Sequence, residues 1–299
     1  MAADPWAECE RLLSAAGQEA DALRDLCTGA DLFDKAQKEQ CVSLLGWLGQ
    51  EADPSALGGL LSAGDVGEVF GPPGVGKTQV ALSVAVNCAV TGNSVTYIAT
   101  KDLPEHLAFR MHDILVAQGR SAESVCAALG NVRVITAHDF SDFARIISAG
   151  ALHKDGETNF PKLLVIDSLS GLLVPFAGAS GGAFRGGAIY GSAHRWRLAW
   201  ASRALRQLAV ECGVRVLLIS HTIGGSEGGP GAQLALGQLW AAAATTRLEL
   251  SADHHCNLCN TGSGLRLTLR KSQHSPVGLS TSLLLDGAGV HACPCGTQQ

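Results

Sequence analysis

The stretch that decides the fold is Gly71-Pro-Pro-Gly-Val-Gly-Lys-Thr78, which matches the pattern G-x-x-x-x-G-K-[ST]. It follows a short apolar run, 66–70, and precedes a helical pattern that begins at Lys77 and ends at about Val90. Glycines allow consecutive backbone N–H groups to turn inward around a phosphate, and a helix N-terminus adds partial positive charge. Strand, glycine-rich loop and helix in this order predict a phosphate-binding loop.

Each residue type in this loop has a chemical task. The lysine reaches the β- and γ-phosphates of a nucleotide, and the hydroxyl residue binds Mg²⁺, so we assign these tasks to Lys77 and Thr78. A second apolar run, 163–166, ends at Asp167, whose carboxylate can hold the same Mg²⁺ through water. The predicted ATP-binding residues are Gly71, Pro72, Pro73, Gly74, Val75, Gly76, Lys77, Thr78 and Gln79. The predicted cofactors are therefore ATP and Mg²⁺.

Strand-like and helix-like segments alternate beyond the loop. The expected strands are 94–99, Val132–Thr136, 163–166 and 214–220, and the expected helices are 103–119, 139–149 and 193–212. Three further strand-like runs, 245–250, 264–270 and 280–285, close the chain. Continuous apolar strands that alternate with helices predict an α/β fold. We expect a P-loop ATPase core with a mostly parallel, twisted sheet, helices on both faces and antiparallel C-terminal strands.

The chain divides into three parts of unequal size. Residues 1–29 carry one apolar stripe at helical spacing and predict a short helical N-terminal segment. Residues 30–64 form a linker and docking segment, and residues 65–299 form the ATP-binding core. The first part is too small to hold a hydrophobic core alone, so we interpret it as an appendage.

Composition excludes several classes of protein. With 46% hydrophobic and 16% charged residues, the chain is not disordered throughout. The net charge of −5 gives no global basic field, so any contact with DNA has to be local. We expect no membrane-spanning segment, because no apolar run of sufficient length exists. Ten irregularly spaced cysteines without a secretory signal predict free thiols in a reducing, intracellular compartment.

Hydrolysis of ATP also needs a group that orients the attacking water, usually a carboxylate or a glutamine. The strand at 94–99 is followed by Thr100-Lys-Asp-Leu-Pro-Glu105, in which Lys101 has the wrong charge for a base. Asp102 and Glu105 are the candidate replacements. A catalytic residue therefore stays unassigned on sequence grounds.

These motifs together resemble the RecA-type recombinases of eukaryotes. In that family the strand typically ends Asp-Thr-Glu and the glutamate polarises the water, whereas this chain has Ala99-Thr-Lys101. Further motifs look like the recombinase paralogues, most like the D-type paralogue: Gly29-Ala-Asp-Leu-Phe, Leu236-Gly-Gln-Leu-Trp, Thr246-Arg-Leu and Arg270-Lys-Ser-Gln-His-Ser-Pro-Val-Gly. Active recombinases normally carry glutamine where this chain has His221, so the resemblance makes His221 a candidate γ-phosphate sensor. The alternative is a histidine that ends a buried strand.

The resemblance also implies surfaces for DNA and for partners. The family binds single strands through two loops, which match 176–191 and 223–236 here. The candidate DNA-binding residues are Arg185, Tyr190, Arg195 and Arg197. The second loop has no basic residue, and we interpret it as a flexible connection. Phe33 and Ala36 have the Phe-x-x-Ala spacing by which family members dock into a neighbour, although an ordinary helical turn has the same pattern.

A cysteine and histidine cluster near the C-terminus has spacing typical of zinc ligands. Its members are His254, His255, Cys256, Cys259, Cys293 and Cys295. No fixed second half of a zinc motif accompanies it, so we expect no zinc and interpret the first part as a hairpin tip. Trp196 and Trp200, four residues apart on a helix, are expected in the core.

The sequence thus favours an ATP-binding subunit of a recombinase-paralogue complex that acts in DNA repair by homologous recombination. It would bind single-stranded DNA as part of the complex, or help to load recombinase on it, with weak or absent ATP hydrolysis. The resemblance implies other paralogues as partners and a nuclear location. The alternatives are an autonomous DNA-stimulated ATPase and a P-loop small-molecule kinase; the missing glutamate counts against the first, and the lack of an arginine in 223–236 counts against the second.

Overall fold

The computed structural model describes residues 61–148, 152, 160–173, 192–223, 233–234, 236–253, 263–273 and 275–293. The expected N-terminal helix and most of the docking segment lie outside these ranges, as do most residues of the two glycine-rich loops and of the cysteine and histidine cluster.

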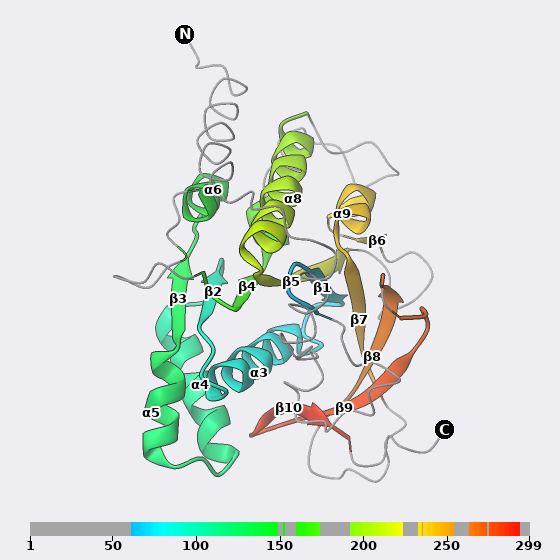
Figure 1. Ribbon diagram of the computed structural model, residues 1–299. Helices are drawn as coiled ribbons and strands as arrows, with labels where there is room; N and C mark the ends of the chain where they lie inside the picture. The colour runs from blue at the N-terminus through cyan, green and yellow to red at the C-terminus, as the bar shows by residue number, and fades with distance from the viewer. Residues whose placement is uncertain are drawn as a thin grey trace, which may run out of the picture.

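One mixed sheet forms the centre of the structure (Figure 1). Its parallel strands are β1 (Val66–Gly71), β2 (Val95–Ala99), β3 (Val132–Thr136), β4 (Leu163–Asp167), β5 (Arg215–Ile223) and β7 (Thr246–Ala252). In space they follow the order β7-β1-β5-β4-β2-β3. The phosphate-loop strand β1 therefore lies between β5 and β7, and β4 lies between β5 and β2.

The C-terminal strands extend this sheet with the opposite polarity. β8 (Ser263–Lys271), β9 (Ser280–Asp286) and β10 (Gly289–Ala292) pair antiparallel in sequence order beyond β7. A short strand, β6 (Gln233–Leu234), pairs antiparallel with the end of β5. The expected α/β class, with a mostly parallel sheet and antiparallel C-terminal strands, is confirmed; β10 and β6 were not expected.

Helices cover both faces of the sheet (Figure 1). One face carries α3 (Lys77–Val90), α4 (Pro104–Ala117) and α5 (Ala122–Gly130). The other carries α6 (Phe140–Ser148), α7 (Leu169–Leu173), α8 (Ser192–Cys212) and α9 (Gly237–Ala243). Side chains along a strand alternate between the two faces, so Tyr97 lies in the first core and Ile98 in the second. Every residue of β2 and β4 is buried, as expected for mainly apolar strands in the middle of a parallel sheet.

The helix expected over 103–119 is present as α4, and a further helix that was not expected follows it. α4 begins after Leu103 with Pro104 in its first turn, where the missing N–H is no loss. It ends before Gly119, whose φ of 74° is accessible to glycine without strain. A second helix, α5, then begins after Ser121, whose hydroxyl accepts a hydrogen bond from the Ser124 N–H at 3.3 Å.

A buried ion pair ties β1 to its neighbours β5 and β7. Glu68 is 1% exposed and accepts hydrogen bonds from the Ser220 hydroxyl at 2.5 Å and from Arg247 Nε at 2.6 Å. The Arg247 guanidinium also lies 4.6 Å from the centre of the Phe70 ring. Because both carboxylate oxygens are satisfied, the charge of Glu68 is compensated inside the core.

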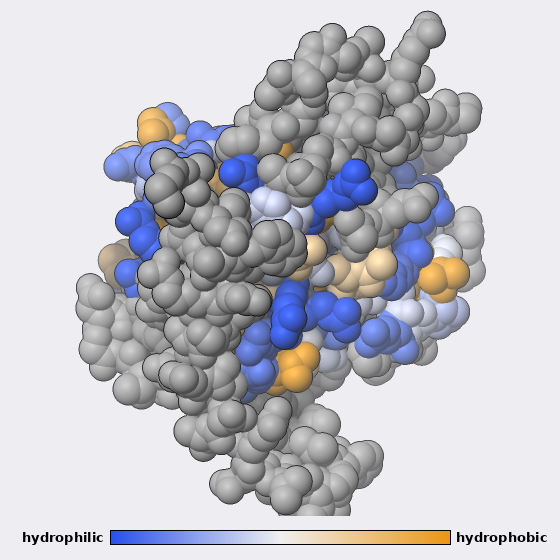
Figure 2. Space-filling model, turned by 90° about the horizontal axis from the view of Figure 1, so that it is seen from above, coloured by the Kyte–Doolittle hydropathy of each residue, from blue (hydrophilic) through white to orange (hydrophobic). Residues whose placement is uncertain are grey.

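One face of the structure presents mainly hydrophilic residues among those that are described (Figure 2). Figure 2 shows small, separated hydrophobic areas among hydrophilic ones on one face. The large exposed apolar side chains are Leu103, Phe109, Val116, Val210 and Val277. Within the described ranges, no helix combines the length and apolar composition that crossing a membrane requires.

Candidate nucleotide-binding site

The carboxyl ends of four adjacent parallel strands meet at one edge of the sheet. Gly71, at the end of β1, pairs with His221 of β5. Asp167, at the end of β4, pairs with Ile219 of β5 and with Ala99 of β2. Ligands of open α/β sheets bind at this edge, beyond the carboxyl ends of the strands. The topology therefore brings the phosphate loop, Asp167, His221 and the segment after β2 together.

The loop between β1 and α3 requires glycine at several positions. A Cβ at Gly71 would collide with the backbone carbonyl oxygen of Leu250 on β7. Gly74 and Gly76 have φ values of 80° and 103°, in the region that favours glycine. Gly76 directly precedes α3, so the N–H groups of the first helical turn face the loop. This arrangement forms a cradle of N–H donors that suits a phosphate.

Lys77 lies inside this cradle with 4% of its surface exposed. Its Nζ donates hydrogen bonds to the carbonyl oxygens of Gly71 at 3.0 Å and Pro72 at 2.6 Å. Burial lowers the pKa of Lys77 to about 8; the Asp167 carboxylate raises it and the Lys101 ammonium lowers it further. The neutral carbonyl oxygens compensate the Lys77 ammonium less well than an anion does. An anion bound in the loop therefore favours the charged form of Lys77.

This lowered pKa predicts proton uptake on nucleotide binding. Above about pH 8 the lysine is largely neutral, whereas a bound phosphate favours its charged form. We expect ATP affinity to fall as pH rises through about 8 and binding at about pH 9 to take up close to one proton. Calorimetry in two buffers of different ionisation enthalpy measures the uptake. Lys77→Arg is the control, since its guanidinium does not titrate; a buffer-independent heat for the parent chain would contradict the prediction.

Asp167 is positioned by two hydroxyl groups. The Tyr97 hydroxyl donates to Asp167 Oδ2 at 2.9 Å, and the Thr78 hydroxyl also hydrogen-bonds the carboxylate. Burial raises the pKa of Asp167, while the hydrogen bonds from Thr78 and Tyr97 and the charge of Lys77 lower it. The Thr78 and Asp167 oxygens therefore lie side by side, and oxygen atoms are the ligands that Mg²⁺ prefers. The residues present fit a Mg²⁺–nucleotide.

A chain of polar contacts joins β2, β4 and β5 at the same edge. The Thr100 hydroxyl accepts a hydrogen bond from the Ser168 N–H at 2.9 Å. Ser168 Oγ lies 3.1 Å from Ser170 Oγ and 3.5 Å from His221 Nε2. Burial is the main reason that the pKa of His221 falls to about 4, so its ring is neutral at pH 7. His221 Nδ1 is buried without a hydrogen-bond partner among the described residues, which leaves one polar atom at the site for a ligand or water.

The two candidate acids differ in their electrostatic effect on the site. The Asp102 charge raises the pKa values of both Asp167 and Tyr97, so Asp102 acts on an expected Mg²⁺ ligand. Glu105 lies in the first turn of α4 and is exposed. Of the two, Asp102 is the better placed to act on water near a phosphate. Lys101, between Thr100 and Asp102, is also exposed.

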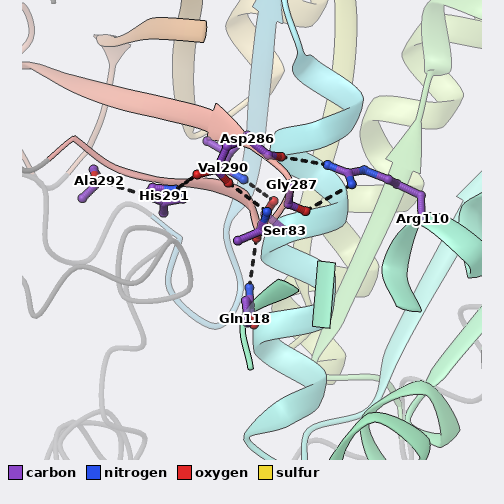
Figure 3. A network of polar contacts seen from close by, with 9 residues as sticks. Ser83, Arg110, Gln118, Asp286, Gly287, Val290, His291 and Ala292 are labelled. Carbon is purple, nitrogen blue, oxygen red and sulfur yellow. Dashed lines mark hydrogen bonds and ion pairs between the residues drawn. The ribbon is translucent and has the colours of Figure 1, made fainter. Parts of the chain in front are cut away.

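Gln79 connects the phosphate loop to the C-terminal strands. Arg110 of α4 donates from Nε to Gln79 Oε1 at 2.8 Å, and its terminal nitrogens donate to the carbonyl oxygens of Asp286 and Gly287 (Figure 3). Ser83 of α3 accepts a hydrogen bond from the Val290 N–H at 2.8 Å. The turn between β9 and β10 is thus held against the two helices that flank the site.

The candidate DNA-binding residues differ in where they lie. Arg185 and Tyr190 lie outside the described residues, and Arg195 is exposed on α8. Arg197 instead lies over the rings of Phe140 and Trp196, at 5.5 and 5.7 Å from their centres. This stacking gives Arg197 a packing role within the core. As expected, Trp196 and Trp200 pack there too, edge-on against Phe140.

The remaining predictions are not settled by the described residues. Phe33, Ala36 and most of the cysteine and histidine cluster lie outside them. Within the described ranges, no group of three or more His, Cys, Asp or Glu side chains is arranged to hold a metal ion.

Sequence reasoning missed three residues that shape this edge: Tyr97, Thr100 and Arg110. Each acts through a partner far along the chain, at Asp167, Ser168 or Asp286. The only sequence signal was the presence of polar atoms within or just after an apolar strand at 94–100, which singles out Tyr97 and Thr100. Arg110 lies within a helix, and nothing in the sequence indicated that it contacts the site.

Comparisons with known proteins agree with this geometry. A family model described as "AAA domain" matches residues 42–224, more than half of the chain. "DNA repair protein RAD51 homolog 4" of Bos taurus is 29% identical over 271 residues, covering 88% of this chain and 77% of the relative. "DNA repair and recombination protein RadB" of Halobacterium salinarum is 38% identical over 115 residues, covering 38% of this chain and 44% of the relative. A crystal structure of the RadB recombinase matches with a TM-score of 0.58 at 22% identity, covering 84% of this chain and 96% of that one.

The fold and the phosphate loop define a P-loop nucleotide-binding protein, and the chain belongs to the AAA-domain family. Membership in this family implies nucleotide binding. The relatives to which the chain is similar are named as DNA repair and recombination proteins. None of these comparisons supports the small-molecule kinase alternative.

Proposed function

We propose that this chain is an ATP-binding subunit of a recombinase-paralogue complex that acts in DNA repair by homologous recombination. One observation carries the proposal: an intact phosphate site, in which Thr78 hydrogen-bonds Asp167 and the charges of Lys77 and Asp167 act on each other, has Lys101 where active recombinases carry the glutamate that polarises water. ATP and Mg²⁺ would be held while turnover stays weak or absent. The similarity to "DNA repair protein RAD51 homolog 4" supports the paralogue assignment and its D-type resemblance.

In this proposal the bound nucleotide promotes assembly of the recombinase-paralogue complex. Mg²⁺–ATP would contact the ends of β1, β4 and β5 at once, and so fix the edge of the core. Other recombinase paralogues are the proposed partners, with Phe33 and Ala36 as docking residues. Single-stranded DNA would be bound by the complex, with Arg185, Tyr190, Arg195 and Arg197 as candidates, and the nucleus is the proposed location.

A second candidate function rests on Asp102. The charge of Asp102 acts on Asp167, so Asp102 is the candidate to replace the missing glutamate. An autonomous DNA-stimulated ATPase would then be possible. The two functions differ in turnover, because a positioned base contributes about 10²–10⁴-fold to a hydrolysis rate.

Steady-state ATP turnover, titrated with single-stranded DNA, distinguishes the two functions. Lys77→Ala serves as the blank. We expect the parent chain to bind ATP but to turn it over no faster than the blank. DNA-stimulated turnover that disappears in Lys77→Ala and in Asp102→Asn would favour the second function.

Assembly provides the direct test of the first function. The parent chain and Lys77→Ala are each co-expressed with the other recombinase paralogues of the same organism, and complexes are purified with and without Mg²⁺–ATP. We expect Lys77→Ala to assemble poorly and to lose ATP-dependent DNA binding. Lys162→Ala is the matched control, since this exposed lysine precedes β4 at the opposite edge of the sheet. Equal assembly and DNA binding by Lys77→Ala and the parent would contradict the proposal.

A further inference from the structure

We propose that Lys101 is a second phosphate-binding residue, which contacts the terminal phosphate of the nucleotide and makes the site prefer a nucleoside triphosphate to a diphosphate. The inference rests on the proposed function and extends it, because it assigns a role to the residue that replaces the missing glutamate. It also states which part of the nucleotide is recognised.

The backbone at Lys101 is held next to the Mg²⁺ ligands. The preceding residue, Thr100, donates its N–H to the Asp167 carbonyl oxygen at 2.9 Å and accepts a hydrogen bond from the Ser168 N–H at 2.9 Å. Its hydroxyl also contacts the Ser168 carbonyl oxygen at 3.1 Å. These contacts join the end of β2 to the end of β4. The backbone of Lys101, the next residue, is therefore held at a fixed position beside Asp167.

The end of the Lys101 stem lies against Gly171 of α7. A Cβ added at Gly171 would lie 3.0 Å from Lys101 Cε and 2.9 Å from Thr100 Oγ1. The Lys101 side chain thus packs directly over the glycine, since a larger residue there would push it away. Such packing reduces the number of rotamers that the stem can adopt and so lowers the entropy cost of a contact made by the ammonium.

The charge of Lys101 acts on the site. Lys101 lowers the pKa values of both Lys77 and His221, so its charge acts on the phosphate loop and on the end of β5. It makes no hydrogen bond or ion pair with any residue in the described ranges. Two lysines are therefore gathered at one edge beside a neutral histidine.

The acids at this edge do not neutralise that pair of lysines. Asp167 is engaged by Tyr97 and Thr78 and is the expected Mg²⁺ ligand. Asp102 contributes its charge to Asp167 and Tyr97 but forms no ion pair with Lys101. An anion with several negative charges is the ligand that two nearby lysines recognise best, and the terminal phosphate of a triphosphate provides it. A diphosphate lacks this group and would leave Lys101 without a contact.

The test compares ATP and ADP binding to the full-length chain by titration calorimetry with Mg²⁺. We expect Lys101→Gln to weaken ATP about tenfold, the effect of losing one charge-assisted contact, while ADP affinity changes less than about twofold. Lys101→Arg keeps the charge and should recover most of the ATP affinity. Lys162→Gln removes an exposed lysine at the opposite edge and should leave both affinities unchanged.

The outcomes separate the two proposals. Equal loss of ATP and ADP affinity in Lys101→Gln, or no loss of either, overturns the role of Lys101 while nucleotide binding by the parent chain stands. A parent chain that binds neither nucleotide overturns the proposed function and this inference with it. Lys101 is exposed, so Lys101→Gln should fold like the parent; its thermal midpoint without nucleotide checks this.

Discussion

Replacing Lys77 by alanine is expected to weaken ATP binding about hundredfold or more and to remove the rise in thermal midpoint that ATP produces. Lys77 is 4% exposed and lies among loop carbonyls, where its ammonium can donate to the phosphates with little competition from water. Each hydrogen bond to a charged group contributes about 1.5–3 kcal/mol, and 1.4 kcal/mol corresponds to a factor of ten. Loss of two such bonds gives the expected change.

Thermal unfolding with increasing ATP and Mg²⁺ measures this effect. A ligand at a hundred times its Kd stabilises the native state by about 2.7 kcal/mol, which shifts the midpoint of the parent chain measurably. Lys77→Ala should show no shift at the same concentration, and the control Lys162→Ala should behave like the parent. An unchanged ATP-dependent shift in Lys77→Ala would mean that the loop is not where the nucleotide binds.

Replacing Glu68 by alanine is expected to lower the free energy of unfolding by about 3–5 kcal/mol. The carboxylate accepts from Ser220 and from Arg247, and it is almost completely buried. Its removal leaves the Arg247 guanidinium, 11% exposed, without its counter-charge. An unpaired buried charge is among the largest single costs that a folded protein can carry.

Glu249 provides a matched control for this prediction. It too pairs with an arginine on a neighbouring strand, Arg270, but the two side chains are 25% and 54% exposed. Glu249→Ala should therefore cost less than about 1 kcal/mol. Urea unfolding followed by tryptophan fluorescence and by circular dichroism gives both values. A further variant, Glu68→Leu with Arg247→Met, removes both charges and should recover much of the loss; equal costs for Glu68→Ala and Glu249→Ala would contradict the explanation.

The elements that the sequence predicts well are those whose cause is local. β4 begins with four consecutive apolar residues and β2 is mainly apolar, and α3 follows a glycine-rich loop of recognisable pattern. The elements that were not predicted are specified by only a few residues each. α5 begins at one serine after one glycine, and β10 has four residues after a tight turn. Such segments are stabilised by what they pack against, which a single sequence does not reveal.

The same division applies to the candidate site. The loop and Asp167 carry a recognisable order of residues, so their meeting at one edge of the sheet follows from the expected parallel strands. Lys101 was recognised only as the wrong charge for a base. Its proximity to Lys77 and His221 depends on the spatial order of β1, β5, β4 and β2, which differs from their order along the chain. Only the folded sheet indicates what that charge can contact.

The position of β1 has a consequence for the synthesis of the chain. β1 pairs only with β5 and β7, which emerge from the ribosome long after it. At about 5–20 residues per second, roughly eight seconds or more separate the appearance of residue 71 from that of residue 223, where β5 ends. Until then the six residues of β1, all buried in the folded protein, have no partner strand, and the edge that pairs with β7 stays open longer still. The nascent protein therefore exposes an apolar strand with two open edges, so its yield in cells should depend on chaperones that cover such segments until translation is nearly complete.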